Sequence, residues 1–357
     1  MSTSVLRRSI SQLFMVGVPG PALDAEVREF LLEYPPGGIV LFKRNVHSAS
    51  QLRRLVTDLH ALGPGVPPIV GIDHEGGRVD RLRMRPFTMF PAAAVVAAAK
   101  SVRLAEAVGE AMGRELAAVG VDIDFAPVLD VWANPRNQVI GDRAYGTTAA
   151  QVARFGIAVA RGLERGGVLP CGKHFPGHGR TLGDSHKVLP RVSASRRALT
   201  ASELPPFARA IRAGIPALMT AHVVYPALDA THPATLSAAI CTTLLRKRLG
   251  FTGVLFSDDL EMHAVAGRIT PERLAPAALA AGCDMLLVCQ SLGIAERAIA
   301  GVEQAVESGA LAPARVTEAA LRIHDLRRRV PARRPSPRLG WAAHTRLARR
   351  LQLSAVR

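Results

Sequence analysis

The chain has 357 residues, of which 48% are hydrophobic, and it carries a formal net charge of +16. This apolar content is sufficient for a large buried core, either in one large α/β barrel or in two ordinary domains. The apolar runs are short and interrupted by charged residues, and none approaches the roughly 20 residues needed to cross a bilayer. The composition therefore argues against a membrane-spanning protein.

The positive charge is concentrated at the C-terminal end. Residues 326–357 contain ten arginines, no lysine and no acidic residue, so +10 of the net +16 lies there and about +6 remains for the rest of the chain. This distribution argues against a nucleic-acid-binding domain. We expect residues 1–330 to form the folded unit. We expect the Arg- and Pro-rich extension, residues 331–357, to be solvated and partly disordered, with a tether to an anionic surface or nucleic acid as the alternative.

The four cysteines, Cys171, Cys241, Cys283 and Cys289, lack C-x-x-C spacing and lie in apolar surroundings. This pattern is typical of reduced, buried thiols in a cytoplasmic protein, and a disulfide between two of them is the alternative. The apolar stretch near the N-terminus is short and runs into a Pro-Gly turn, so we interpret it as a first strand and not as a signal peptide.

Short β-type apolar runs recur along the chain, and nearly all are followed by an amphipathic segment of helix length. The runs cover residues 13–17, 38–42, 69–72, 122–126, 168–172, 217–221, 253–257 and 285–289. Eight such units within about 320 residues predict a single α/β domain, a (β/α)₈ barrel of the TIM type. An open doubly wound sheet is the alternative, but it would require a G-x-G-x-x-G after the first strand, and none is present.

Polar and ionisable side chains follow most of these predicted strands. They are Lys43, Arg44 and Asn45, then Asp73, Pro127 with Asp130, Lys173 with His174, His222, and Ser257 with Asp258 and Asp259. In barrels the carboxyl ends of the strands meet around one mouth, where the active site is built. The sequence therefore predicts one site with contributions from several strands.

The most distinctive stretch is KHFPGHGRTLGDSH, residues 173–186. In extended backbone Asp184 and His186 project to the same side, so the carboxylate can fix the imidazole tautomer and make the histidine a proton carrier. The glycines at 177, 179 and 183 would let the loop fold over a ligand and move. A purely structural Asp–His hydrogen bond is the alternative interpretation.

The three histidines of this stretch also raise the possibility of metal binding. His174, His178 and His186 are potential ligands, but an H-x₃-H pair on a Pro-Gly turn lacks the helical geometry that aligns two imidazoles. We therefore expect no metal.

FSDDLEM places two adjacent carboxylates at a strand end. Because side chains alternate along a strand, we expect only one of Asp258 and Asp259 to point into the barrel mouth, and the pattern does not choose between them. The other aspartate would cap the following helix or hold a neighbouring loop.

Two further segments carry charges suited to holding a polar ligand through several hydrogen bonds. They are GIDHEGGRVDR, with Asp73, Glu75, Arg78 and Arg81, and VIGDRAYG, with Asp142 and Arg143. Ion pairs that only fix the loops are an equally good interpretation for Glu75, Arg78 and Asp142.

Together these motifs resemble glycoside hydrolase family 3, in particular its single-domain bacterial β-N-acetylglucosaminidases. The resemblance runs from about residue 13 to residue 328. It rests on D-x-E-G-G-R-V-x-R (residues 73–81), K-H-F-P-G-H-G followed by D-S-H (residues 173–186), and F-S-D-D-L-x-M (residues 256–262). PATLS (233–237) and LFKRN (41–45) also look like the family. The arginine-rich extension is not part of the family pattern.

The resemblance implies a retaining enzyme that removes terminal β-linked GlcNAc from cytoplasmic, peptidoglycan-derived GlcNAc–1,6-anhydroMurNAc fragments. It implies Asp258 as the nucleophile and His186, supported by Asp184, as the acid/base. The positions that would hold the sugar hydroxyls are Asp73, Arg81, Arg143, Lys173 and His174. It implies no cofactor and a monomer whose partner is a small-molecule substrate, with no nucleic acid and no membrane span. A phosphorylase on the same fold is the alternative.

Overall fold

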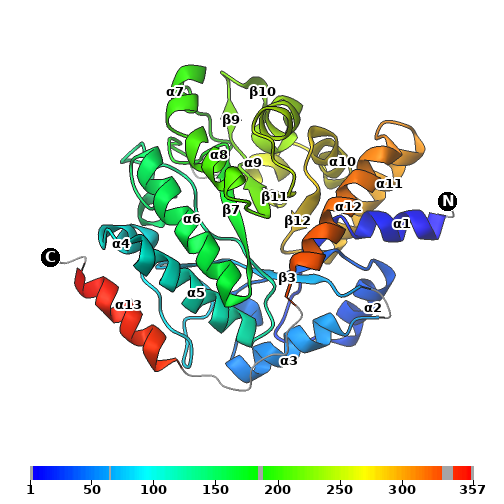
Figure 1. Cartoon of the computed structure of the whole chain (residues 1–357). Helices are drawn as coiled ribbons and strands as arrows, with labels where there is room; N and C mark the ends of the chain where they lie inside the picture. Colours follow the sequence, from blue (N-terminus) through cyan, green and yellow to red (C-terminus); the bar gives the residue numbers. More distant parts are fainter. Residues whose placement is uncertain (1–2, 64–65, 184–187, 332–340, 355–357) are drawn as a thin grey trace.

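The computed structural model describes residues 3–63, 66–183, 188–331 and 341–354 of the chain. Eight parallel strands form a closed barrel in the order β1-β12-β11-β8-β7-β6-β3-β2, with helices around it (Figure 1). The barrel strands are β1 (Phe14–Gly17), β2 (Gly38–Leu41), β3 (Ile69–Ile72), β6 (Ile123–Asp124), β7 (Leu169–Phe175), β8 (Ala217–Thr220), β11 (Val254–Asp259) and β12 (Met285–Val288). The predicted (β/α)₈ barrel and all eight predicted strands are confirmed.

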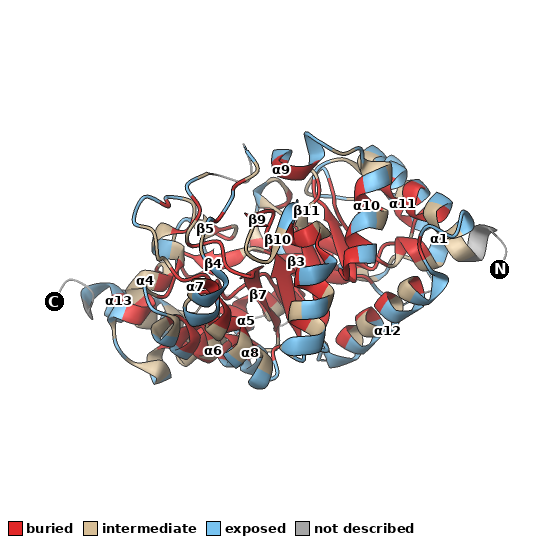
Figure 2. Cartoon of the chain, turned by 90° about the horizontal axis from the view of Figure 1, so that it is seen from above, coloured by how far each residue is buried: buried red, intermediate tan, exposed pale blue. Residues whose placement is uncertain are grey.

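The helices cover the outside of the barrel, so that their apolar faces meet the strands and their outer faces are exposed (Figure 2). The α-helices are α1 (Thr3–Ser11), α2 (Ala25–Glu33), α3 (Ala49–His60), α4 (Ala93–Ala98), α5 (Val102–Ala118), α6 (Ala149–Gly166), α7 (Arg196–Ala201), α8 (Leu204–Arg212), α9 (His263–Ala266), α10 (Pro271–Ala281), α11 (Leu292–Glu307), α12 (Pro313–Arg329) and α13 (Ala342–Ser354). Within the described ranges, no helix has the length and apolarity needed to cross a membrane.

Short elements complete the loops between strands and helices. Three are of 3₁₀ type, η1 (Lys43–Asn45), η2 (Gly141–Arg143) and η3 (Ala234–Leu236), and η4 (Ala239–Arg248) is a π-helix. Two small hairpins pair β4 (His74–Gly76) with β5 (Val79–Asp80), and β9 (Val224–Tyr225) with β10 (Asp229–Pro233). The β4–β5 hairpin follows β3 directly, and it carries Glu75 to the mouth of the barrel.

Local sequence explains where several helices begin and end. The Ser48 hydroxyl accepts a hydrogen bond from the Gln51 N–H, and the Gln51 side-chain oxygen accepts one from the Ser48 N–H, which forms a capping box at the start of α3. The Thr148 hydroxyl caps α6 by accepting from the Gln151 N–H, and Gly167 ends that helix in the left-handed conformation with φ 90°. The residues of β1, β2, β3, β8 and β12 are buried throughout, as expected for parallel strands covered on both faces.

Two strands become irregular at the mouth of the barrel. In the β7–β8 pair Gly172 lies opposite Leu218, but Phe175 lies opposite Thr220, so β7 has one extra residue in this interval. The β11–β12 pair has the same irregularity between Phe256 and Asp259. Such bulges re-aim side chains that would otherwise alternate strictly between the two faces.

Part of the C-terminal extension is ordered, although its sequence favours a solvated segment. Residues 342–354 form α13, which packs against α4 and α5 (Figure 1). Leu351 is fully buried there, and His344 Nδ1 lies 2.8 Å from Oε1 of the buried Glu115 on α5. A few apolar residues, Ala348 and Leu351 among them, anchor a helix whose arginines Arg346, Arg349 and Arg350 are exposed.

We predict that Leu351→Ala will loosen this docking. Removing a fully buried leucine side chain costs about 2–5 kcal/mol where the surroundings cannot collapse, so amide hydrogen exchange in residues 342–354 should accelerate markedly. Leu353 is 64% exposed on the same helix, and Leu353→Ala is the matched control, with an expected change below about 0.5 kcal/mol. Equal exchange in the two variants would contradict the docked position of α13.

Candidate active site

A polar pocket opens at the carboxyl ends of the barrel strands, with a volume of about 240 Å³. Six of the eight predicted site residues line it, namely Asp73, Arg81, Arg143, Lys173, His174 and Asp258. The two others, Asp184 and His186, lie outside the described residues. The pocket wall also contains Glu75, His178, Asp259, Phe42, Met219 and Gln290.

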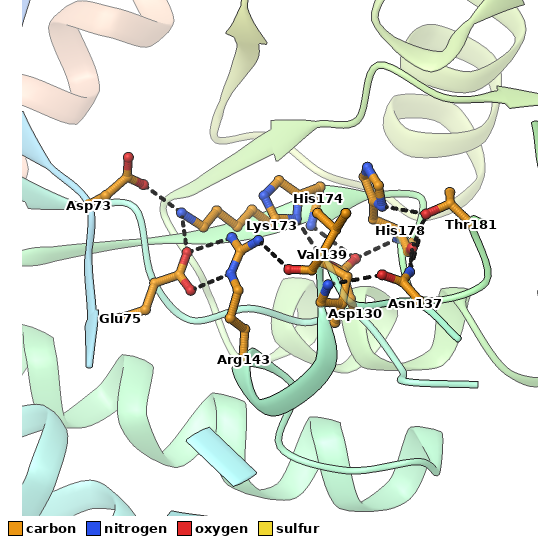
Figure 3. Close-up of polar contacts among 12 residues, drawn as sticks. Asp73, Glu75, Asp130, Asn137, Val139, Arg143, Lys173, His174, His178 and Thr181 are labelled. Atoms are coloured by element: carbon orange, nitrogen blue, oxygen red, sulfur yellow. Dashed lines mark hydrogen bonds and ion pairs between the residues drawn. The ribbon is translucent and has the colours of Figure 1, made fainter. Parts of the chain in front are cut away.

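Lys173 is the centre of a charged cluster on one wall of the pocket (Figure 3). Its Nζ lies 2.6 Å from Asp73 Oδ1 and 2.7 Å from Glu75 Oε1. Arg143 binds the same Glu75 in bidentate fashion, with Nε 2.8 Å from Oε2 and one terminal nitrogen 2.7 Å from Oε1. Arg81 approaches Asp73 at 3.4 Å. Glu75 thus joins Arg143, from η2, to Lys173, from β7.

The cluster is ionised. Burial opposes the charged form of Asp73, but Lys173 and Arg81 outweigh it and hold the Asp73 pKa below its ordinary value. Burial is likewise outweighed at Glu75, whose pKa is lowered by Arg143 and Lys173, and at Lys173, whose pKa is raised by Asp73 and Glu75. Charged side chains that hold one another in place present donors and acceptors at fixed positions. Such an arrangement suits recognition of the hydroxyl groups of a sugar.

Asp130 organises the turn that follows Lys173. This fully buried carboxylate accepts from His174 Nδ1 at 2.7 Å and from the His178 backbone N–H at 2.6 Å. The Nδ1 contact fixes the tautomer of His174, so that Nε2 is the ring nitrogen left for a ligand. Gly179 lies so close to the chain that an added Cβ would be 1.7 Å from the Val131 carbonyl oxygen. At Gly179, therefore, glycine is required by close packing, whereas we expected it to serve loop motion.

Asp258 and Asp259 both border the pocket, but their carboxylates have different partners. Asp259 Oδ1 accepts from the backbone N–H groups of Glu261 and Cys289, at 3.0 and 3.3 Å, and so holds a neighbouring loop as predicted for the second aspartate. The lysine and histidine of β7 enter the same pocket through the bulge of that strand.

The two aspartates differ in protonation. Burial raises the pKa of Asp259 to about 7. At Asp258 burial is outweighed by the nearby imidazoles His222 and His174, and the pKa lies below its ordinary value. Of this pair, Asp258 is therefore the carboxylate that favours the ionised form.

His178 faces the pocket in its neutral form. Burial, together with the neighbouring His174, lowers its pKa to about 4. Its Nδ1 lies 3.0 Å from Thr181 Oγ1, and its ring contacts that of His174 edge-on at 5.7 Å. Among the described residues, no three His, Cys, Asp or Glu side chains are grouped to hold a metal. His186, the third histidine considered as a ligand, lies outside these residues.

The four cysteines are buried free thiols. Cys289 lines the pocket, and burial raises its pKa well above the ordinary value, so the thiol stays protonated.

Asp124, at the end of β6, gives a testable pH dependence. Burial raises its pKa from 3.8 to about 8. Between these values the folded state binds more protons than the unfolded chain, so the free energy of unfolding should fall as pH rises. We predict that Asp124→Asn will flatten this fall, measured by urea unfolding at about pH 5 and about pH 8.5. An identical loss in variant and parent would contradict a buried, protonated Asp124.

The sequence matches known proteins over this same architecture. The profile of the glycosyl hydrolase family 3 N-terminal domain matches residues 5–326. The chain belongs to glycosyl hydrolase family 3. It is 44% identical over 283 residues to a beta-hexosaminidase of Chromobacterium violaceum, covering 77% of this chain and 78% of that one. The beta-hexosaminidase of Methylococcus capsulatus is 43% identical over 304 residues, covering 84% and 88%.

Solved structures of family 3 enzymes have the same fold. A glycoside hydrolase family 3 beta-N-acetylglucosaminidase from a Paenibacillus species superposes with a TM-score of 0.94 at 36% identity, covering 98% of this chain and 68% of that one. NagZ from Neisseria gonorrhoeae, in complex with zinc ion, gives a TM-score of 0.81 at 33% identity, covering 95% and 97%. Because the NagZ superposition covers nearly all of both chains, NagZ has the same single-barrel architecture.

The structure shows two residues of this family 3 site whose roles the sequence left open or did not assign. Glu75 was equally well interpreted as a loop-fixing residue, and Asp130 was only one of several polar residues after strands. Both act through other side chains, Glu75 on Lys173 and Arg143, and Asp130 on His174. Spacing alone does not find such partners, because the contacts join residues 68 and 44 positions apart.

Proposed function

We propose that this protein is a retaining exo-β-N-acetylglucosaminidase that removes terminal β-linked GlcNAc from peptidoglycan-derived GlcNAc–1,6-anhydroMurNAc fragments. The observation that carries the proposal is the ionised carboxylate of Asp258 in the same pocket as the Lys173 cluster. A single pocket thus holds an anionic group suited to attack and a wall suited to hydroxyl recognition.

The beta-hexosaminidase activity is supported by membership of the family. The family 3 match and the curated relatives, which are beta-hexosaminidases, make the chain a glycosidase of this class. The preference for GlcNAc is supported by the Paenibacillus beta-N-acetylglucosaminidase, whose structure covers nearly the whole chain. The choice of a cell-wall fragment as the substrate rests on the resemblance of the motifs to bacterial wall-recycling enzymes.

In the proposed mechanism Asp258 attacks the anomeric carbon and forms a covalent glycosyl-enzyme. His186, supported by Asp184, gives a proton to the departing oxygen and then accepts one from the water that releases the sugar. A histidine suits this exchange because its ordinary pKa lies near neutrality. These roles for Asp184 and His186 are proposed from the motif alone.

The sugar ring would be held by the charged cluster around Lys173, which lines the same pocket as Asp258. Asp73 and Glu75 present carboxylate oxygens, whereas Lys173, Arg81 and Arg143 present N–H donors. His174, fixed by Asp130, supplies a donor or acceptor at Nε2. This mixture of donors and acceptors suits hydroxyl groups, because each hydroxyl can donate one hydrogen bond and also accept.

We further propose that the protein acts in the cytoplasm as a monomer. The buried free thiols are compatible with a reducing compartment. Gel filtration with light scattering would test the monomer, because a stable dimer would double the measured mass.

The function is tested by analysing products with and without phosphate. We expect free GlcNAc from GlcNAc–1,6-anhydroMurNAc and from an aryl β-GlcNAc glycoside in either buffer, and NMR should show the β-anomer first. Formation of GlcNAc 1-phosphate in the phosphate sample would show that the enzyme is a phosphorylase and not a hydrolase. An α-anomer as the first product would exclude retention, and cleavage of the aryl glycoside alone would exclude the proposed natural substrate.

A further inference from the structure

The segment from Asp130 to Arg143 links separate parts of the pocket wall, and Asn137 lies at its centre (Figure 3). Asn137 is 2% exposed, and both ends of its side-chain amide are used. Nδ2 donates to the His178 carbonyl at 2.8 Å and to Thr181 Oγ1 at 3.2 Å, while Oδ1 accepts from the Ile140 N–H at 2.9 Å. One side chain therefore joins two stretches of chain that are about 40 residues apart in sequence.

On one side of Asn137 is the turn that carries Arg143. Ile140 and Val139 line the pocket, and the Arg143 backbone N–H donates to the Ile140 carbonyl at 2.9 Å. The Arg143 guanidinium donates to the Val139 carbonyl at 3.1 Å while it holds Glu75. The position of the guanidinium thus depends on the turn that Asn137 fixes.

On the other side is the stem of the loop that leads to Asp184. Thr181 is fully buried three residues before Asp184, and its hydroxyl contacts both Asn137 and His178 Nδ1. Asn134 adds weaker contacts, from Nδ2 to the carbonyls of Arg180 and Thr181 at 3.4 and 3.3 Å. The point from which the chain continues towards Asp184 is therefore held relative to Arg143.

We infer that Asn137 is a positioning residue for proton transfer: through Thr181 it sets the loop stem of the proposed acid/base dyad against the wall that holds the sugar. The inference rests on the proposed function, since it takes the dyad to be Asp184–His186. Asn137 acts on the reaction through Thr181 and not by touching the sugar. General acid catalysis requires hydrogen-bond geometry at the leaving oxygen, so a displaced stem should impair protonation first.

Leaving-group dependence separates this role from a purely structural one. A departing phenol with a pKa of about 4 needs little protonation, whereas one with a pKa of about 10 needs it strongly. For Asn137→Ala we expect kcat/KM to fall about 10-fold with the activated aryl β-GlcNAc glycoside and about 10²–10³-fold with the unactivated one. A uniform fall across the series would overturn the inference and leave Asn137 a structural residue.

Thr181→Val provides a second, nearly isosteric variant that removes only the hydroxyl. It leaves the Asn137–Ile140 contact, and with it the Arg143 turn, in place. We expect the same leaving-group dependence with little change in KM. In the double variant the two losses should not add, because both changes break one connection. Additive losses would show that Asn137 and Thr181 act independently, against the inference.

Asn45 is the matched control. It is a fully buried asparagine whose amide also donates twice, to the carbonyls of Val18 and Gly20, and accepts once, from the Phe42 N–H. Asn45→Ala should lower kcat/KM by a similar factor for all leaving groups. If Asp258→Asn retained activity, the proposed function would fail. If only the leaving-group dependence were missing, the inference alone would fail.

Discussion

Asp258→Asn should lower kcat/KM for an aryl β-GlcNAc glycoside by about 10⁴-fold or more, because the amide cannot attack the anomeric carbon. The shape and burial of the side chain are nearly unchanged, so the melting temperature should stay close to that of the parent. Steady-state kinetics together with thermal unfolding checks both expectations. Loss of folding in this variant would make the kinetic result uninformative, and Asp258→Glu, which shifts the carboxylate by one methylene, then tests the same geometry.

Asp259→Asn is the matched control for this experiment. Both aspartates line the pocket, but Asp259 is engaged with the backbone of Glu261 and Cys289, and burial raises its pKa to about 7. Because an amide oxygen can still accept these hydrogen bonds, we expect a loss of only about 10-fold. A larger loss at 259 than at 258 would exchange the proposed roles of the two residues.

Glu75→Ala should be among the most destabilising single changes in the pocket. It leaves the Arg143 guanidinium, which is 14% exposed, without its carboxylate partner, and it removes one of two anions from Lys173. Breaking a buried ion pair from one side typically costs about 3–5 kcal/mol. We expect a loss of this size in the free energy of unfolding, measured by urea titration, together with weaker substrate binding.

The control is another ion pair of the same mouth, Arg78–Asp142, whose side chains are 46% and 53% exposed. Asp142→Ala should cost less than about 1 kcal/mol, because exposed pairs are solvated in both states. If Glu75→Ala proved as mild as Asp142→Ala, Glu75 would be a loop residue of the kind its motif also allowed. Glu75→Gln would then separate the charge from the hydrogen bonds.

The barrel could be predicted from sequence because its strands are apolar runs repeated at helix-length intervals, and each run is buried in the structure. The same regularity could not choose between Asp258 and Asp259. Alternation assigns them opposite faces, and the structure adds that the Asp259 carboxylate binds the backbone of Glu261 and Cys289, beside an extra residue in β11. A bulge depends on pairing with a neighbouring strand, and a single strand's sequence does not contain that information.

Partnerships over long sequence separations were equally out of reach. The hydrogen bond from His174 to Asp130 and the ion pair between Arg143 and Glu75 form only when the barrel closes. The α13 helix shows another limit of composition. Its many arginines favour a solvated segment, yet Ala348 and Leu351 are buried in the apolar cluster to which α4 and α5 contribute. The overall composition of a segment does not reveal the few apolar residues that pack against the rest of the protein.

The pairing of charges in the pocket wall has a consequence for how substrate arrives. Three strong cations, Arg81, Arg143 and Lys173, are matched by three carboxylates, Asp73, Glu75 and Asp258, so these six groups sum to zero in a protein of net charge +16. Capture of an uncharged aryl β-GlcNAc glycoside should be nearly insensitive to ionic strength, since neither this ligand nor the sum of these six groups carries a net charge to be screened. These six groups therefore act on a ligand at short range, through directional hydrogen bonds, and not through long-range electrostatic attraction.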